Sequence, residues 1–97
     1  MQMPKPLVMI ENWAVVKGGS RVAYQQLQPG NILTGKVYGH ARLPDAKPIY
    51  TSPILSVDVP KLIVETRNTL YQLGQVSEDY KKSGEYQTWQ REISAAA

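Results

Sequence analysis

The sequence predicts one mainly β domain, with five or six antiparallel strands in a small SH3-like barrel or half-barrel, followed by one or two short helices. Three observations lead to this prediction. Residues 31–74 hold four β-like runs separated by turn residues, a further apolar run lies near residues 12–17, and a helical spacing of apolar residues begins after residue 77. The expected parts are therefore an extended segment at 1–6, a sheet or barrel at 7–74 and a helical segment at 77–93.

The first β-like run alternates most clearly, and its two faces differ in chemistry. One face carries Leu33, Gly35, Val37 and Gly39, and the other carries Thr34, Lys36, Tyr38 and His40. Glycines on an apolar face leave room for close packing or permit a sharp bend, which is how a small sheet curls towards a barrel.

The next runs are interrupted by proline and by turn residues. One face is expected to carry Ile49, Thr51, Leu55 and Val57. Pro53 cannot donate a ladder hydrogen bond and so predicts a sheet edge or a bulge. Residues 62–66 and 70–73 are then expected to form a hairpin.

The amino-terminal part contains a strand that is apolar on both sides. Trp13 and Val15 fall on one face and Ala14 and Val16 on the other, which predicts a central position in the sheet or a place at an interface. The segment 22–24 is the candidate partner of this strand, and the shorter run 7–10 fits either a strand or a helical turn.

After Gly74 the pattern becomes helical. Ser77 can cap a helix whose first turn is acidic, Gly84 should weaken or break that helix, and Ser83 can cap a second helix. On the second helix Tyr86, Trp89 and Ile93 form one apolar stripe. Docking on the domain's own sheet is the favoured explanation of this stripe, and contact with another chain is the alternative.

Composition restricts the class of protein. Ninety-seven residues suffice for one domain, and the absence of cysteine favours a reducing, cytoplasmic environment without disulfides. No secretory leader or membrane-spanning run is apparent, so no membrane partner is expected. Residues 1–76 carry eight basic and four acidic side chains, a mild and dispersed excess of +4.

Residues that could carry chemistry are few. His40 is the single histidine, and its candidate catalytic partners are Thr51 and Ser52, with no spacing that fixes their geometry. No phosphate-binding loop or metal-ligand spacing is present. We therefore name no catalytic residue, metal or cofactor, and the sequence favours a non-enzymatic protein.

Several short segments carry a resemblance. Residues 35–45 (GKVYGHARLPD), 49–53 (IYTSP), 64–67 (VETR) and 71–74 (YQLG) together resemble small uncharacterised bacterial proteins carried as cargo by prophages and other mobile elements, such as integron cassettes. The match covers about forty residues; Ala41, Ala46 and Lys47 depart from the family's turn residues, and Asn68–Thr69 replaces a serine-glycine hairpin. The resemblance implies no activity, and it carries over no catalytic or binding residue.

Three functional hypotheses follow. The first is an interaction protein that forms a homodimer or binds a protein partner; its candidate surface comprises Trp13, Val16, Tyr86, Trp89 and Ile93. The second is an SH3-like or OB-like nucleic-acid-binding module, with candidate contacts at Lys36, Tyr38, His40, Arg42, Lys61 and Arg67. The third is a small hydrolase or ligand pocket; its candidate residues are His40, Arg42, Thr51 and Ser52.

Overall fold

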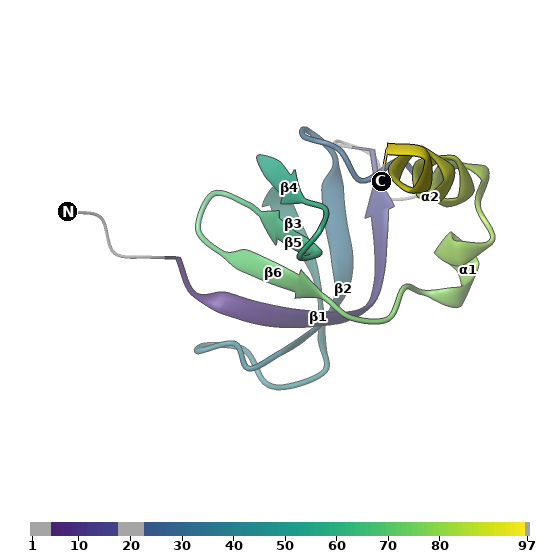
Figure 1. Cartoon of the computed structure of the whole chain (residues 1–97). Coiled ribbons are helices and arrows are strands. Elements are labelled where there is room, and N and C mark those ends of the chain that lie inside the picture. The colour runs from purple at the N-terminus through teal and green to yellow at the C-terminus, as the bar shows by residue number, and fades with distance from the viewer. Residues whose placement is uncertain (1–4, 18–22, 97) are drawn as a thin grey trace.

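The computed structural model describes residues 5–17 and 23–96, which form six strands and two helices (Figure 1). The strands are β1 (Leu7–Val16), β2 (Ile32–Tyr38), β3 (Lys47–Pro53), β4 (Ser56–Asp58), β5 (Ile63–Glu65) and β6 (Leu70–Leu73), and the helices are α1 (Glu78–Lys81) and α2 (Gly84–Ala96). All six strands belong to one sheet, in the order β3-β2-β1-β6-β5-β4. The prediction of a mainly β domain with carboxy-terminal helices is confirmed.

One strand pair differs from the prediction of an antiparallel sheet. Four of the five pairings are antiparallel, but β1 and β6 run parallel, with Leu7 opposite Leu70 and Ile10 opposite Leu73. Parallel neighbours need a long crossover connection. Here four other strands lie between β1 and β6 in the chain, so local turn patterns could not reveal the pairing. The ambiguous run at 7–10 is the first part of β1.

β1 contains a bulge beside the glycine-bearing face of β2. Glu11 pairs with Lys36 but Ala14 pairs with Thr34, so β1 has one residue more than β2 across this step, and Asn12 adopts a φ of 54°. Gly35 lies against the bulge. A Cβ added there would be 2.8 Å from the Glu11 carbonyl oxygen. The close approach predicted for this glycine is confirmed, and β1 curves strongly along its length (Figure 1).

The sheet is curled, and two residues connect its opposite edges. β3 and β4 are the two edge strands, yet only Ile54 and Leu55 separate them in the chain. The Ile54 amide donates to the Asn31 carbonyl and the Leu55 amide donates to the Glu65 carbonyl, so this corner contacts both halves of the sheet. Within the described residues β3 and β4 do not pair with each other, which leaves the sheet open.

The edge position predicted from Pro53 is confirmed, but the prediction that Leu55 shares one face with Ile49 and Thr51 is wrong, because Thr51 is buried and Leu55 is exposed. Ile54 is buried and Leu55 is 55 % exposed. The alternation of β3 ends at Pro53, and the corner that follows places Ile54 under the sheet.

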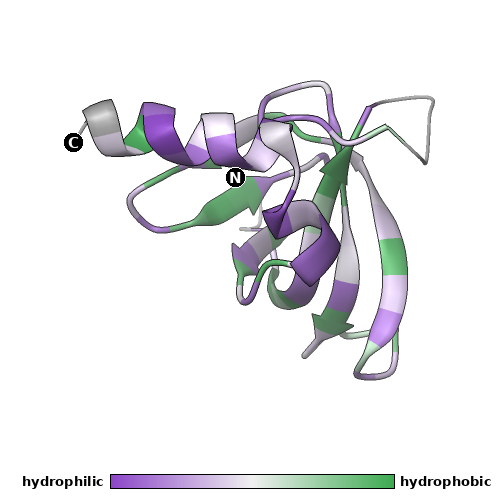
Figure 2. Cartoon of the chain, turned by 90° about the vertical axis from the view of Figure 1, so that its right-hand side faces the viewer, coloured by the Kyte–Doolittle hydropathy of each residue, from purple (hydrophilic) through white to green (hydrophobic). Residues whose placement is uncertain are grey.

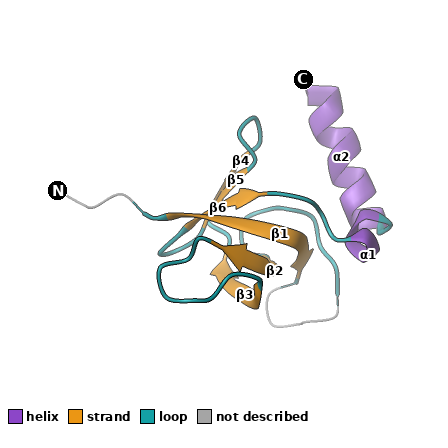
Figure 3. Cartoon of the chain, turned by 90° about the horizontal axis from the view of Figure 1, so that it is seen from below, coloured by secondary structure: helices purple, strands orange, loops and turns teal. Residues whose placement is uncertain are grey.

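The core fills the concave side of the sheet, and the helices lie at the end of the domain near the second half of β1 (Figures 1 and 3). Most strands contribute residues to this core. Among the core residues are Val8, Ile10, Val15, Leu33, Val37, Ile54, Val64, Tyr71 and Leu73. Figure 2 shows hydrophobic segments mainly in the strands, whereas the helices are mostly hydrophilic.

The predicted starts of both helices are confirmed by their caps, whereas α2 extends to Ala96, beyond the expected end at residue 93. The Ser77 hydroxyl accepts from the Tyr80 amide and the Ser83 hydroxyl accepts from the Tyr86 amide, so each serine satisfies an amide in the first turn of its helix. Of the candidate partner segment 22–24, residue 22 lies outside the described part of the chain, and Tyr24 forms a single bridge with Val16.

Candidate functional site

An aromatic cluster joins the helices to β1. The Trp13 ring lies 5.7 Å from the Tyr80 ring, 6.1 Å from the Tyr86 ring and 6.3 Å from the Trp89 ring, measured between centroids. The Trp13 indole nitrogen also donates to the Gly74 carbonyl. Such edge and tilted contacts favour a well-packed interior. The stripe on α2 therefore docks on the chain's own sheet, which was the favoured explanation.

This packing corrects the surface that the sequence suggested for partner binding. Trp13, Val16 and Trp89 are only 4, 3 and 5 % exposed, and they belong to the interior of the domain. Tyr86 and Ile93 are half-buried and pack against the core. Along the second half of β1, both apolar faces of the strand are thus covered by other residues of the same chain.

Tyr80 is a member of this interior that the sequence analysis did not single out. It is fully buried, its hydroxyl donates to the Gln25 carbonyl, and burial raises the pKa of its phenol well above its usual value. The four-residue α1 is too short to show a helical period, so no pattern marked this side chain.

The first half of β1 is less covered than the second half: its convex face carries apolar side chains that remain exposed. Leu7 is 55 % exposed and Met9 is 41 % exposed, although β1 is an interior strand of the sheet. Strand register places Leu70 beside Leu7, and Tyr38 beside Met9. One step further across the sheet, Gln72 separates Met9 from Ile63. We call Leu7, Met9, Tyr38, Ile63 and Leu70 the outer patch.

The residues suggested for nucleic-acid binding do not form one surface. Lys36 and Tyr38 lie on the convex side of β2, and Lys61 lies in the turn between β4 and β5. Arg42 belongs to the loop between β2 and β3, and Arg67 to the turn between β5 and β6, both at the other end of the sheet from Lys61. His40 and Arg42 are the only two of this set that line one pocket among the described residues.

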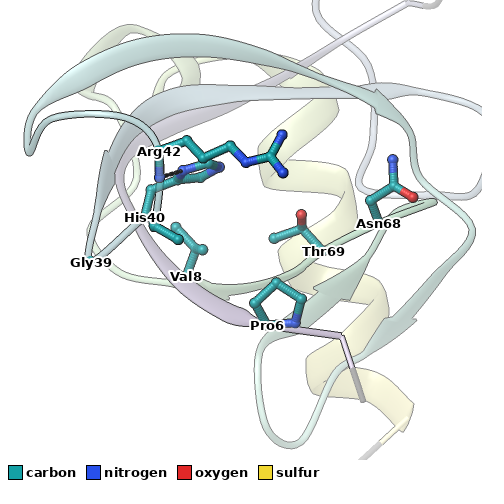
Figure 4. A pocket seen from close by; sticks show the side chains of 8 residues that line it. Pro6, Val8, Gly39, His40, Arg42, Asn68 and Thr69 are labelled. Atoms are coloured by element: carbon teal, nitrogen blue, oxygen red, sulfur yellow. Dashed lines mark hydrogen bonds between the residues drawn. The ribbon is translucent and has the colours of Figure 1, made fainter. Parts of the chain in front are cut away.

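That pocket is a hollow of about 600 Å³ at the end of the sheet where β1 begins (Figure 4). Its wall is built from three separate segments of the chain: Pro6, Val8, Gly39, His40, Ala41, Arg42, Asn68 and Thr69. We call it the Arg42 pocket. In Figure 4 the Arg42 side chain extends across the hollow from the His40 side towards Asn68 and Thr69.

His40 is held by the loop in which it lies. Its Nδ1 accepts from the amides of Arg42 and Leu43, at 2.9 and 3.1 Å. In the neutral ring the proton is therefore on Nε2.

Thr51 and Ser52, the candidate partners of His40, are not beside it. The Thr51 hydroxyl is bonded to the Leu33 amide near the start of β2, whereas His40 lies beyond Tyr38, the last residue of that strand, which is roughly 17 Å from Leu33 at about 3.3 Å per residue. The structure does not assemble the nucleophile and base that the hydrolase hypothesis requires.

Within residues 5–17 and 23–96 no group of three histidine, cysteine, aspartate or glutamate side chains is placed to hold a metal ion. No helix in the described part of the chain is long and apolar enough to cross a membrane. Comparisons with protein-family models, curated proteins and solved structures found no match for this chain.

Proposed function

We propose that this chain is an interaction module that self-associates through the outer patch. The observation that carries the proposal is the exposure of Leu7 and Met9 on an interior strand of the sheet. Large neighbouring apolar side chains on a small soluble domain are typical of interaction sites. The burial of the aromatic cluster leaves the outer patch as the apolar surface best suited to this role.

Association through the face of the sheet is favoured over association through its edges. β3 carries Pro48 and Pro53, which cannot donate to an added strand, and β4 has only three residues. A partner that approached either edge would gain few main-chain hydrogen bonds.

A second copy of the chain is the occupant that we propose. Lys36 flanks the outer patch on the β2 side, and Asp58 lies at its other side, in line with Met9 and Ile63. A two-fold arrangement that crosses the strands can therefore place Lys36 of one copy near Asp58 of the other, with the apolar residues between them.

The expected association is weak. Burying the exposed part of one Leu or Met side chain contributes roughly 1 kcal/mol, and a symmetric pair buries four of them from Leu7 and Met9. Association costs on the order of 4 kcal/mol or more in lost freedom. Contacts from Tyr38, Ile63 and Leu70 must supply the remainder, so we expect a concentration-dependent dimer and not an obligate one.

Light scattering across a concentration series tests the proposal. We expect the average mass to rise with concentration for the wild type and for Leu55→Lys, and to stay that of a monomer for Leu7→Lys. The two leucines are equally exposed, at 55 %, but Leu55 lies at the corner between β3 and β4, outside the outer patch. A monomeric wild type at millimolar concentration, or equal effects of both substitutions, would refute self-association through this face.

The same experiment with a short mixed-sequence oligonucleotide addresses the nucleic-acid hypothesis. A mass increase at low salt that is lost at high salt would replace our proposal with that one. The half-barrel of SH3-like kind, the cytoplasmic location and the mobile-element origin remain predictions that accompany the proposal.

A further inference from the structure

We propose that the Arg42 pocket binds a small organic carboxylate, with the Arg42 guanidinium as the group that receives the anion. This inference is independent of self-association, because it concerns a concave site at the end of the sheet and not its convex face. The argument rests on the charge, the hydrogen bonding and the lining of this pocket.

The guanidinium of Arg42 is available to a ligand. It has no hydrogen bond or ion pair to any other described residue, and no carboxylate lines the pocket. Two acidic side chains next to the walls of the pocket are already engaged: Asp45, in the loop of Arg42, accepts from the Gly39 amide, and Glu65, at the end of β5, pairs with Lys5 at 2.6 Å. Arginine therefore supplies a positive charge and a planar fork of donors that no described acidic group neutralises by direct contact.

The wall that carries Arg42 is organised before any ligand binds. The His40 ring bonds two amides of its own loop, and the Gly39 amide bonds Asp45, so the loop is fixed at both ends. Because Nδ1 is the acceptor in these bonds, Nε2–H is the remaining donor of His40, which lines the same hollow as Arg42.

The opposite wall is also held by hydrogen bonds within the chain. The Thr66 amide and hydroxyl both donate to the Thr69 carbonyl, and the Leu70 amide donates to the Pro6 carbonyl. Lys5 donates to the Thr66 carbonyl as well. A pocket with two fixed walls loses little conformational entropy when a ligand enters, which favours binding.

The donor set fits a carboxylate better than a phosphate. The pocket offers one guanidinium, one imidazole N–H and the side chain of Asn68, whereas the Thr69 hydroxyl is hydrogen-bonded to the Tyr71 phenol and the loop amides of Arg42 and Leu43 already bond His40. A phosphate dianion usually takes more charge and free backbone amides than this. Pro6 and Val8 add an apolar surface, and about 600 Å³ accommodates a ligand with an organic body.

Titration of the isotope-labelled protein by two-dimensional NMR tests the site, with benzoate as the probe and benzamide as its uncharged control. We expect saturable benzoate-dependent shifts at the amides of residues 39–43 and 66–70, with benzamide at least ten-fold weaker. Arg42→Gln should weaken benzoate binding at least ten-fold. Arg67→Gln, which removes an exposed charge beside the pocket but outside its lining, should leave the affinity within about two-fold.

Two additional probes distinguish the possible sources of the carboxylate and test phosphate as an alternative ligand. An acetylated dipeptide with a free carboxyl end that binds more tightly than benzoate would identify a peptide terminus as the source, and weaker binding would identify a small free acid. Inorganic phosphate that binds as tightly as benzoate would overturn the carboxylate assignment. Shifts elsewhere in the protein, equal binding of benzamide, or unchanged binding by Arg42→Gln would overturn the site itself.

Discussion

Substitution of Gly35 by alanine tests the packing between β2 and the bulge of β1. The added Cβ would lie 2.8 Å from the Glu11 carbonyl oxygen, 2.9 Å from the Ile10 Cγ1 and 3.1 Å from the Trp13 Cα. Two of these three atoms belong to the backbone, so no side-chain rotation can remove the overlap. The strands must separate, or the bulge must shift.

The expected cost follows from this geometry. Overpacking a well-packed interior lowers the free energy of unfolding by about 1–3 kcal/mol. The lower conformational entropy of alanine in the unfolded chain offsets about 0.4–1 kcal/mol of this cost. We therefore expect Gly35→Ala to lower the free energy of unfolding by about 1–2 kcal/mol, or the melting temperature by roughly 5–15 °C for a domain of this size.

Gly84→Ala is the matched control. It makes the same chemical change at the first residue of α2, where an added Cβ meets nothing within 4 Å. Here the reduced entropy of the unfolded chain is not opposed by any overlap, so we expect the free energy of unfolding to increase by about 0.4–1 kcal/mol.

Urea unfolding measures both variants, with Trp13 and Trp89 as fluorescent reporters of the cluster that joins sheet and helices. A Gly35→Ala protein as stable as the wild type, or stabilised like Gly84→Ala, would contradict the close packing that we describe.

Three further predictions concern the helical end of the domain. Ser77→Ala should cost about 1 kcal/mol in urea unfolding, because it removes the cap of α1. Trp89→Ala should cost about 3–5 kcal/mol in the same assay, since it leaves a cavity beside Trp13. The raised pKa of Tyr80 means that the folded state holds its phenolic proton above pH 10, where the unfolded chain releases it. The contribution of Tyr80 to stability should thus be constant below pH 10 and fall by up to about 1.4 kcal/mol per pH unit above it, and Tyr80→Phe should reduce the alkaline slope in unfolding measurements at pH 9–11.

The candidate site could be predicted only in part. Alternation placed His40 at the end of a strand, and both His40 and Arg42 were singled out as candidate ligand-binding residues. Asn68 and Thr69 were not assigned to any site, since they follow Arg42 by more than twenty residues. The strand register brings Asn68 and Thr69 close to His40 and Arg42, because β6 begins beside the start of β1 and β2 ends beside the same part of β1.

The exposure of the outer patch could not be predicted from the sequence either. A run such as Leu7–Ile10 contains four apolar residues, and periodicity cannot tell which of them face water. In the structure Val8 and Ile10 enter the core while Leu7 and Met9 remain exposed, because β2 and β6 flank this part of β1 and neither of the two described helices covers its convex side. In the second half of β1, in contrast, Trp13 and Val16 are buried.

Local features could be predicted from the sequence: the alternation of β2, the edge position of β3 and the serine caps of both helices. These depend on residues within a few positions of one another, where side-chain direction and backbone preference act directly. The tertiary structure alone decided the parallel pairing of β1 with β6, the burial of the aromatic stripe and the assembly of the Arg42 pocket. Each of these joins segments far apart in the chain, and such contacts are selected by the packing of the whole domain.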